Sequence, residues 1–175
     1  MKIFWQKGFS LIELLVALAI LAVIIAVAVP SMSSMIEANR TDSTAQALFT
    51  SMVAARSEAV ARNQNVVLCK SPNGIFCSTA NDWEQGWLTY VDENGDGVKD
   101  ITDPITGSFS SLHNDFTLRT GAAYSNKLEF RPDGSVSQVG TFRLCGPDAN
   151  TADAKSIVLN ITGRPRGTEG AAQCP

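Results

Sequence analysis

The chain has 175 residues, of which 45% are hydrophobic, and its 14 basic and 17 acidic side chains give a net charge of −3. This acidic balance excludes nucleic-acid binding driven by overall charge, so any such binding must be local. The one histidine, His113, has no serine and aspartate at a triad spacing, and there is no phosphate-binding glycine loop, so we expect neither an enzyme nor a cofactor.

The N-terminal segment has the parts of a secretory signal in an unusual order. Residues 1–8 are short and basic and end at Gly8, and residues 9–30 are apolar apart from Ser10, Glu13 and Pro30. A signal peptide has its small-residue cleavage site after the apolar stretch, whereas here the small residue precedes it. Cleavage after Gly8 would leave the apolar helix on the mature protein.

The apolar stretch is long enough to predict a transmembrane helix over 9–30. Leu11 to Val29 comprises nineteen residues, about 28 Å of helix at 1.5 Å per residue. Lys2 and Lys7 precede it, so the positive-inside rule places residues 1–8 in the cytoplasm and the rest of the chain across the membrane. A plain signal anchor is the alternative, but it gives no reason for a carboxylate in an apolar span.

The run Gly8-Phe9-Ser-Leu-Ile-Glu13-Leu-Leu closely resembles the leader junction of type IV pilins and type II secretion pseudopilins. The resemblance implies that a prepilin peptidase removes the leader after Gly8 and methylates Phe9. It also implies that Glu13 neutralises the α-amino group of Phe9 in a neighbouring subunit. The alternative is a carboxylate that reaches the membrane interface. Pro30 lies where the family has a proline that lets the helix bend or melt.

Apolar residues recur at steps of three and four from Met32 onward, which predicts an amphipathic helix over 31–63. In 64–175, period-two patterns and turn residues predict a β-rich, periplasmic head with strands at Val66–Lys70, Gly86–Asp92, Phe116–Thr120, Lys127–Arg131, Val136–Leu144 and Ser156–Thr162. We therefore expect an α+β fold, in which one long N-terminal helix packs on an antiparallel β-sheet head, as in pilins. Trp83 and Trp87 are expected to pack in this head rather than to form a ligand platform.

The four cysteines, Cys69, Cys77, Cys145 and Cys174, all follow the apolar segment. An even count in a periplasmic domain predicts disulfides, and four cysteines can pair in three ways. We favour Cys69–Cys77, which closes a short loop, and Cys145–Cys174, which ties the C-terminal tail to a strand. A zinc site is the alternative, although the sequence has no C-x-x-C pair.

Acidic residues are concentrated between Asp82 and Asp115, where eight acidic side chains accompany one basic side chain. Within this segment, the spacing of the residues with side-chain oxygens from Asp92 to Asp103 resembles that of the ligands in an EF-hand calcium loop. The last of them is Asp rather than Glu, and the flanking segments are predicted strands rather than helices. An Asx-rich hairpin loop without metal is therefore the other interpretation.

Further motifs extend the resemblance along nearly the whole chain. The segment 55–63 and the runs that begin at Gly86 and Phe130 resemble the FimT/FimU/GspH group of minor pilins and pseudopilins. Near the C-terminus, Gly-Arg164-Pro-Arg166-Gly resembles the GRxR motif with which FimT-type pilins bind DNA during natural transformation. Paired guanidinium groups suit phosphate oxygens, and Arg143 and Lys155 are candidate helpers. The alternative is a solvated arginine pair, or one matched to acidic groups of an adjacent subunit.

The resemblance implies a bacterial inner-membrane protein with one span and a periplasmic head, which enters a filament with other minor and major pilins or pseudopilins. We expect a minor type IV pilin of the FimT/FimU type that primes pilus assembly near the tip, with double-stranded DNA as a phosphate-contact partner of Arg164 and Arg166. The alternative is a GspH-type minor pseudopilin of the type II protein secretion system.

Overall fold

The computed structural model describes residues 8–80, 82–113, 115–147, 150–151, 153–170 and 174. The chain divides into two compact units, Met1–Glu37 and Ala38–Pro175. Helix α1 (Leu11–Arg62) contributes to both units, and its backbone stays helical at Pro30. The proline therefore does not melt the helix.

Helix α1 ends where the sequence predicts, and a left-handed residue terminates it. Asn63 has φ of +56°, a backbone conformation in which asparagine is among the favoured residues. The next residue, Gln64, donates its N–H to the carbonyl of Ala59 at 3.3 Å. This is the six-to-one bond of a Schellman motif, which satisfies a carbonyl at the end of the helix.

The described residues that follow α1 form two antiparallel sheets of four strands each. The first sheet has the order β3 (Ile105–Phe109), β2 (Trp87–Asp92), β1 (Asn65–Lys70) and β5 (Lys127–Phe130). The second sheet has the order β4 (Thr117–Thr120), β6 (Gly140–Cys145), β7 (Lys155–Leu159) and β8 (Pro165–Glu169). Two short 3-10 helices, η1 (Trp83–Gln85) and η2 (Ala122–Tyr124), lie in the connections. The expected α+β fold is confirmed.

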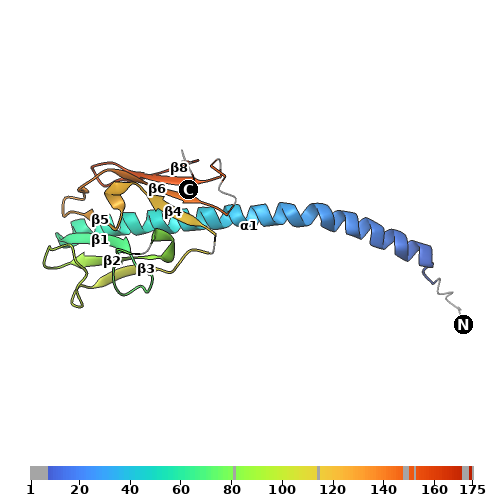
Figure 1. Ribbon diagram of the computed structural model, residues 1–175, viewed down its shortest axis with the longest axis horizontal. Coiled ribbons are helices and arrows are strands. Elements are labelled where there is room, and N and C mark those ends of the chain that lie inside the picture. Colours follow the sequence, from blue (N-terminus) through green and yellow to red (C-terminus); the bar gives the residue numbers. More distant parts are fainter. Residues whose placement is uncertain are drawn as a thin grey trace, which may run out of the picture. The chain divides into compact units, whose positions relative to one another are not determined.

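The core of the head lies between the two sheets and one face of α1. Strands of the first and second sheets lie on opposite sides of the C-terminal part of α1 in Figure 1. The helix contributes Leu48, Met52, Ala55 and Ala59, which recur at helical spacing and are buried. Buried residues of both sheets belong to the same cluster, among them Val66, Leu128, Phe142 and Ile157. Burying each large apolar side chain contributes about 1.5–3 kcal/mol, so this cluster stabilises the head.

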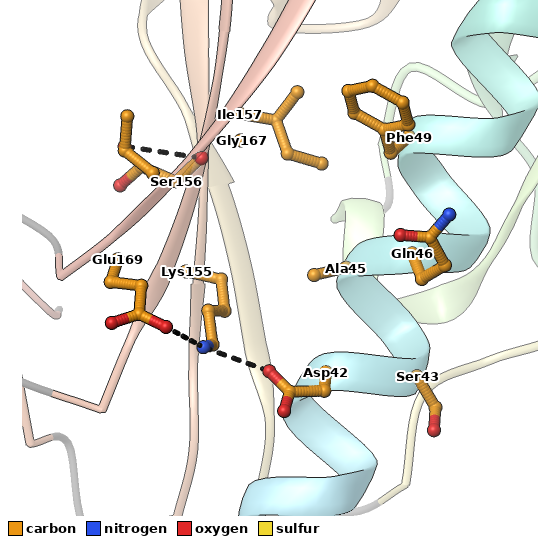
Figure 2. A pocket seen from close by; sticks show the side chains of 11 residues that line it. Asp42, Ser43, Ala45, Gln46, Phe49, Lys155, Ser156, Ile157, Gly167 and Glu169 are labelled. Carbon is orange, nitrogen blue, oxygen red and sulfur yellow. Dashed lines mark hydrogen bonds and ion pairs between the residues drawn. The ribbon is translucent and has the colours of Figure 1, made fainter.

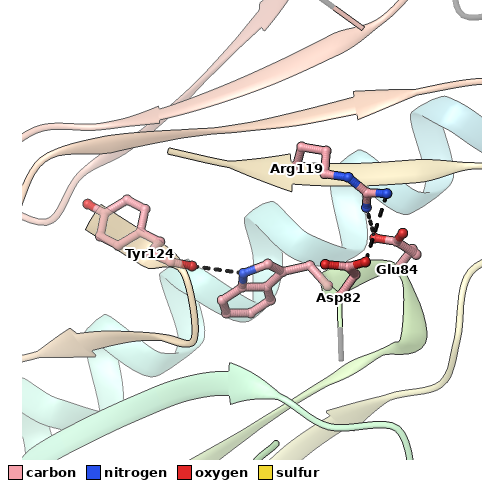
Figure 3. Close-up of polar contacts among 5 residues, drawn as sticks. Asp82, Glu84, Arg119 and Tyr124 are labelled. Atoms are coloured by element: carbon pink, nitrogen blue, oxygen red, sulfur yellow. Dashed lines mark hydrogen bonds and ion pairs between the residues drawn. The ribbon is translucent and has the colours of Figure 1, made fainter. Parts of the chain in front are cut away.

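Polar contacts fasten individual strands to the helices. Lys155 of β7 donates to Asp42 Oδ1 of α1 at 2.9 Å and to Glu169 Oε1 of β8 at 3.3 Å, as Figure 2 shows. Figure 3 shows Arg119 of β4 beside Glu84 of η1, with which it forms an ion pair.

Trp83 and Trp87 pack in the head, which confirms the structural expectation for them. The indole N–H of Trp83 donates to the carbonyl of Tyr124 at 2.9 Å (Figure 3), and its ring meets Phe142 edge-on at a centroid distance of 5.0 Å. Trp87 stacks on Phe109 at 4.2 Å. Both indoles are almost fully buried, so neither forms a ligand platform.

Two disulfides join Cys69 to Cys77 and Cys145 to Cys174, with Cα–Cα distances of 5.6 and 5.9 Å. This is the favoured one of the three pairings, and it excludes a zinc site made of these thiols. The first disulfide closes a loop beside β1, and the second ties residue 174 to the end of β6.

The sequence patterns missed two strands and misplaced the start of a third. Strands β3 and β8 each lie at the edge of their sheet, and their burial is low. Strand β8 contains proline, glycine and charged residues, and β3 has a glycine between two polar residues, so neither shows the apolar alternation on which the prediction depended. Strand β6 begins at Gly140, and Val136 makes only an isolated bridge to Phe130.

Candidate functional site

The N-terminal end of α1 holds Glu13 in a capping arrangement. Ser10 precedes the first helical residue, and its backbone N–H donates to Glu13 Oε2 at 3.0 Å. This is one half of the S-x-x-E capping box, in which the third helical residue satisfies a free N–H. The Glu13 carboxylate therefore lies beside the peptide bond that joins Phe9 to Ser10. Phe9 itself is 82% exposed. Residues 1–7 of the predicted leader lie outside the described residues.

Large apolar side chains of the N-terminal unit are exposed wherever the structure describes them. They are Phe9, Leu11, Ile12, Leu14, Leu15, Val16, Leu18, Ile20, Leu21, Val23, Ile24, Ile25, Met32, Met35 and Ile36. Exposed apolar surface of this extent marks a site of interaction with protein or membrane. Within the described part of the chain, no helix is long and apolar enough to cross a membrane, so the single span expected over 9–30 is not confirmed.

Arg164 and Arg166 lie at the edge of the second sheet. Arg166 belongs to strand β8 and pairs in register with Val158 of β7. Arg164 lies one residue before β8, where its backbone N–H donates to Asn160 Oδ1 at 3.2 Å. Both side chains are exposed. Arg166 is thus held by a strand, and Arg164 lies in the turn that precedes it.

The second sheet directs further arginines away from the core. Leu118, Phe142 and Ile157 are buried, so by alternation Arg119, Arg143 and Arg166 belong to the opposite face. Glu84 binds the guanidinium of Arg119, and the side chain of Arg143 is half-buried. Arg143 therefore shares a face with Arg166 and stays a predicted helper.

Lys155, the other predicted helper, lies on the opposite face of the second sheet from Arg166. Lys155 and Ile157 are two residues apart in β7, so both lie on the side of the sheet that faces the helix. There Asp42 and Glu169 bind the ammonium group of Lys155. The hydrogen bond to Asp42 is the main cause that raises the pKa of Lys155. No local sequence pattern indicates this ion pair, because Asp42 and Lys155 lie more than a hundred residues apart.

Arg56 of α1 anchors the turn that leads to Arg164. Its Nε donates to the carbonyls of Gly134 at 3.0 Å and Thr162 at 3.3 Å. Gly163 has φ of +70°, and a Cβ there would overlap the Gly134 carbonyl oxygen, so only glycine fits. This role of Arg56 cannot be predicted from the sequence, because its partners are backbone carbonyls, which every residue has.

The acidic loop binds its own backbone. The Asp92 carboxylate accepts the N–H groups of Gly95 and Gly97, both at 2.8 Å. Asp103 accepts those of Glu93 at 3.2 Å and Asp100 at 2.8 Å. Among the described residues there is no group of three or more His, Cys, Asp or Glu side chains that could hold a metal ion. These backbone hydrogen bonds are those of an Asx-rich hairpin loop.

The methylation motif and the helix-on-sheet head together define a pilin-like protein. Residues 6–29 match the Prokaryotic N-terminal methylation motif, and residues 44–163 match the family described as Type II transport protein GspH. The second match covers more than half of the chain, so the chain belongs to the GspH family. This confirms the resemblance to type IV pilin-like proteins.

Three solved structures share the fold. Two crystal forms of the type IV minor pilin FimU from Pseudomonas aeruginosa are 20% and 18% identical, with TM-scores of 0.62 and 0.58. The matches cover 78% and 77% of this chain and 96% and 99% of those chains. EpsH, a minor pseudopilin of the Vibrio cholerae Type 2 Secretion System, is 12% identical, with a TM-score of 0.53, over 74% of this chain and 97% of that chain. No curated protein matches the sequence.

Proposed function

We propose that the chain is a minor type IV pilin of the FimT/FimU type, which primes pilus assembly near the tip. The observation that carries the proposal is the exposed apolar surface of the N-terminal unit next to Glu13. Such a surface is stable only in a membrane or against the helices of other subunits. In this proposal the inner membrane holds the precursor by residues 9–30, and a prepilin peptidase cuts after Gly8 before the subunit joins other pilins.

Glu13 is the proposed assembly residue. Cleavage after Gly8 would create an α-amino group on Phe9, and a carboxylate in apolar surroundings needs such an opposite charge. The capping bond to Ser10 shows that Glu13 already accepts a donor next to Phe9. In the filament, the amine of a neighbouring subunit would add to this bond or replace it.

Replacing Glu13 with alanine should leave leader cleavage unchanged and lower incorporation into sheared filaments at least tenfold. The reason is that the unpaired amine would then be left in an apolar environment, at a cost of roughly 2 kcal/mol or more. Cleavage is measured by mass spectrometry of the membrane fraction, and incorporation by immunoblot of the filaments.

Glu37→Ala is the matched control, since it removes a carboxylate from the same helix outside the methylation motif. Equal incorporation of the two variants would refute the charge-pairing role of Glu13.

A role in the type II secretion pseudopilus is the second candidate. It is favoured by the GspH family match and by the fold shared with EpsH. The two candidates predict that the chain rescues different deletion strains. A minor pilin should restore pilus formation in a minor-pilin deletion, and a pseudopilin should restore protein export in a deletion of the secretion pseudopilin. Restoration of export alone would replace the pilus proposal.

We further propose that Arg164 and Arg166 bind the phosphates of double-stranded DNA. The observation behind this is that both are exposed and lie two positions apart at the edge of the second sheet, with Arg143 on the same face. The rest of the head is acidic, so a duplex would be repelled from the loop around Asp92. Binding through phosphates would be independent of sequence and would weaken as salt rises.

The double variant Arg164→Gln/Arg166→Gln should lose most duplex binding by the full chain in detergent micelles and retain its unfolding temperature, because both side chains are exposed. A control variant removes two charges elsewhere, with Lys99→Gln and Arg131→Gln, and should bind as the wild type does. Gel-shift titrations at two salt concentrations measure the effect. If the wild type shows no shift at low salt, the DNA proposal fails and the assembly role remains.

A further inference from the structure

A groove of about 590 Å³ lies between α1 and the last two strands of the second sheet. Figure 2 shows Asp42, Ala45 and Phe49 of α1 on one side and Lys155 and Ile157 of β7 on the other. All these residues belong to the unit Ala38–Pro175. The middle of the groove is apolar, because Ala45, Phe49 and Ile157 meet there and the charges lie at one end.

The groove is open because β8 has no side chain at its centre. In register, Pro165, Gly167 and Glu169 lie opposite Leu159, Ile157 and Lys155, on the side of the sheet that faces the helix. A Cβ built on Gly167 meets nothing within 4 Å. A branched side chain at this position would extend over the half-buried Phe49, beside the buried Ile157, but glycine leaves this space open.

Strand β8 also has an unused edge. It is the last strand of the order β4-β6-β7-β8, and no strand among the described residues pairs with its outer side. The free N–H and C=O groups of an edge strand pair readily with an added extended segment. The apolar groove therefore runs beside a backbone that can accept another strand.

The charges at the end of the groove favour a basic partner. Lys155 is only 23% exposed and is bound by Asp42 and Glu169, whose side chains are 61% and 88% exposed. The trio carries one net negative charge, and its acidic members face solvent. One positive charge on a partner would neutralise the net charge of this trio.

We infer that the groove is a docking surface for an extended segment of a neighbouring filament subunit. The segment pairs with the outer edge of β8, places a branched apolar side chain over Gly167, and brings a lysine or arginine two residues further on to Asp42 and Glu169. The identity of the partner rests on the proposed function, but it is the same for a pilus and for a pseudopilus.

The test uses the full chain in detergent micelles and a fluorescein-labelled peptide, acetyl-Thr-Thr-Val-Thr-Lys-Thr-amide, whose valine and lysine have this spacing. Fluorescence anisotropy should show binding to the wild type. The Gly167→Leu variant fills the groove, and its affinity should fall by about tenfold or more, the scale of one buried apolar side chain. Gly121→Leu is the matched control, because a Cβ at Gly121 also meets nothing within 4 Å, and it should bind normally.

Charge recognition is tested with the peptide that carries glutamate in place of lysine. The wild type should bind it at least about fivefold more weakly, and the difference should shrink in Asp42→Asn/Glu169→Gln, which removes the charges that select lysine. Absence of binding by the wild type, equal binding by Gly167→Leu, or equal affinity for both peptides would overturn the inference. So would self-association of the full chain in light scattering that Gly167→Leu abolishes, because it would assign the groove to a second copy.

Incorporation into filaments separates this inference from the proposed function. Gly167→Leu should be cleaved and folded but incorporated poorly, whereas Gly121→Leu should be incorporated normally. Normal incorporation of Gly167→Leu would overturn the inference and leave the subunit role intact. If Glu13→Ala is incorporated normally, the assembly role assigned to Glu13 fails, while the peptide measurements still decide what the groove binds.

Discussion

At the scale of single residues, the two tyrosines differ in how their buried hydroxyls are satisfied. Tyr124 donates to the carbonyl of Gln138 at 2.6 Å, and its ring packs where any side chain at Gly140 would overlap it. The hydroxyl of Tyr90 is buried without a hydrogen-bond partner. Burial raises the pKa of Tyr124 to about 12, and burial with the nearby Asp92 raises the pKa of Tyr90 further.

This difference predicts opposite effects of the two Tyr→Phe substitutions at neutral pH. Tyr124→Phe leaves the Gln138 carbonyl without its donor and should lower the free energy of unfolding by about 1 kcal/mol. Tyr90→Phe removes an unpaired buried hydroxyl and should be neutral or stabilising. Urea unfolding at pH 7 measures both, and a larger loss for Tyr90→Phe would contradict the assignment.

The same tyrosines predict a loss of stability at alkaline pH. Above pH 10 the unfolded chain releases the tyrosine protons, while the folded chain retains them up to the raised pKa. The unfolded state then binds fewer protons, so the free energy of unfolding falls between pH 10 and 12. Each Tyr→Phe variant should show a shallower fall than the wild type.

At the scale of elements, the sequence predicted what lies in the core better than what lies at an edge. Helix α1 and the strands β1, β2 and β5 carry apolar residues that the sequence shows, because β1 and β2 are buried along nearly their whole length and β5 is buried on one face. Strands β3 and β8 depend on pairing with β2 and β7, which no local pattern records. For the same reason the arginine pair was found as a motif, whereas its strand and the groove beside it were not.

The turn that precedes β8 should depend on Arg56. Arg56→Met keeps the bulk of the side chain but leaves the carbonyls of Gly134 and Thr162 without donors, so we expect a loss of about 1–3 kcal/mol. Hydrogen exchange of the amides of residues 160–164 should accelerate, and Arg56→Lys should restore part of the protection. Arg62→Met, which removes an exposed arginine from the same helix, is the control and should leave these amides unchanged.

At the scale of the whole molecule, the disulfides close loops of different length. The joined cysteines are 8 residues apart in the sequence for Cys69–Cys77 and 29 residues apart for Cys145–Cys174. In the chain-entropy treatment, the longer closure stabilises by about 3–4 kcal/mol and the shorter by about 2–3 kcal/mol. The C-terminal disulfide also ties residue 174 to β6, the strand that lies between β4 and β7.

Replacing both Cys145 and Cys174 with serine should therefore lower the free energy of unfolding more than replacing both Cys69 and Cys77 with serine. Urea midpoints of the two double variants under oxidising conditions measure the difference. A larger loss in the Cys69/Cys77 variant would mean that strain or packing, rather than loop length, dominates.

The chain passes from the first sheet to the second after β3, returns for β5, and leaves again for β6. Neither sheet is encoded by one contiguous stretch of sequence. A single recombination point anywhere between β3 and β6 would therefore build at least one sheet from strands of both parents. We therefore expect new variants of the head to arise in its loops and edge strands rather than by exchange of half a head.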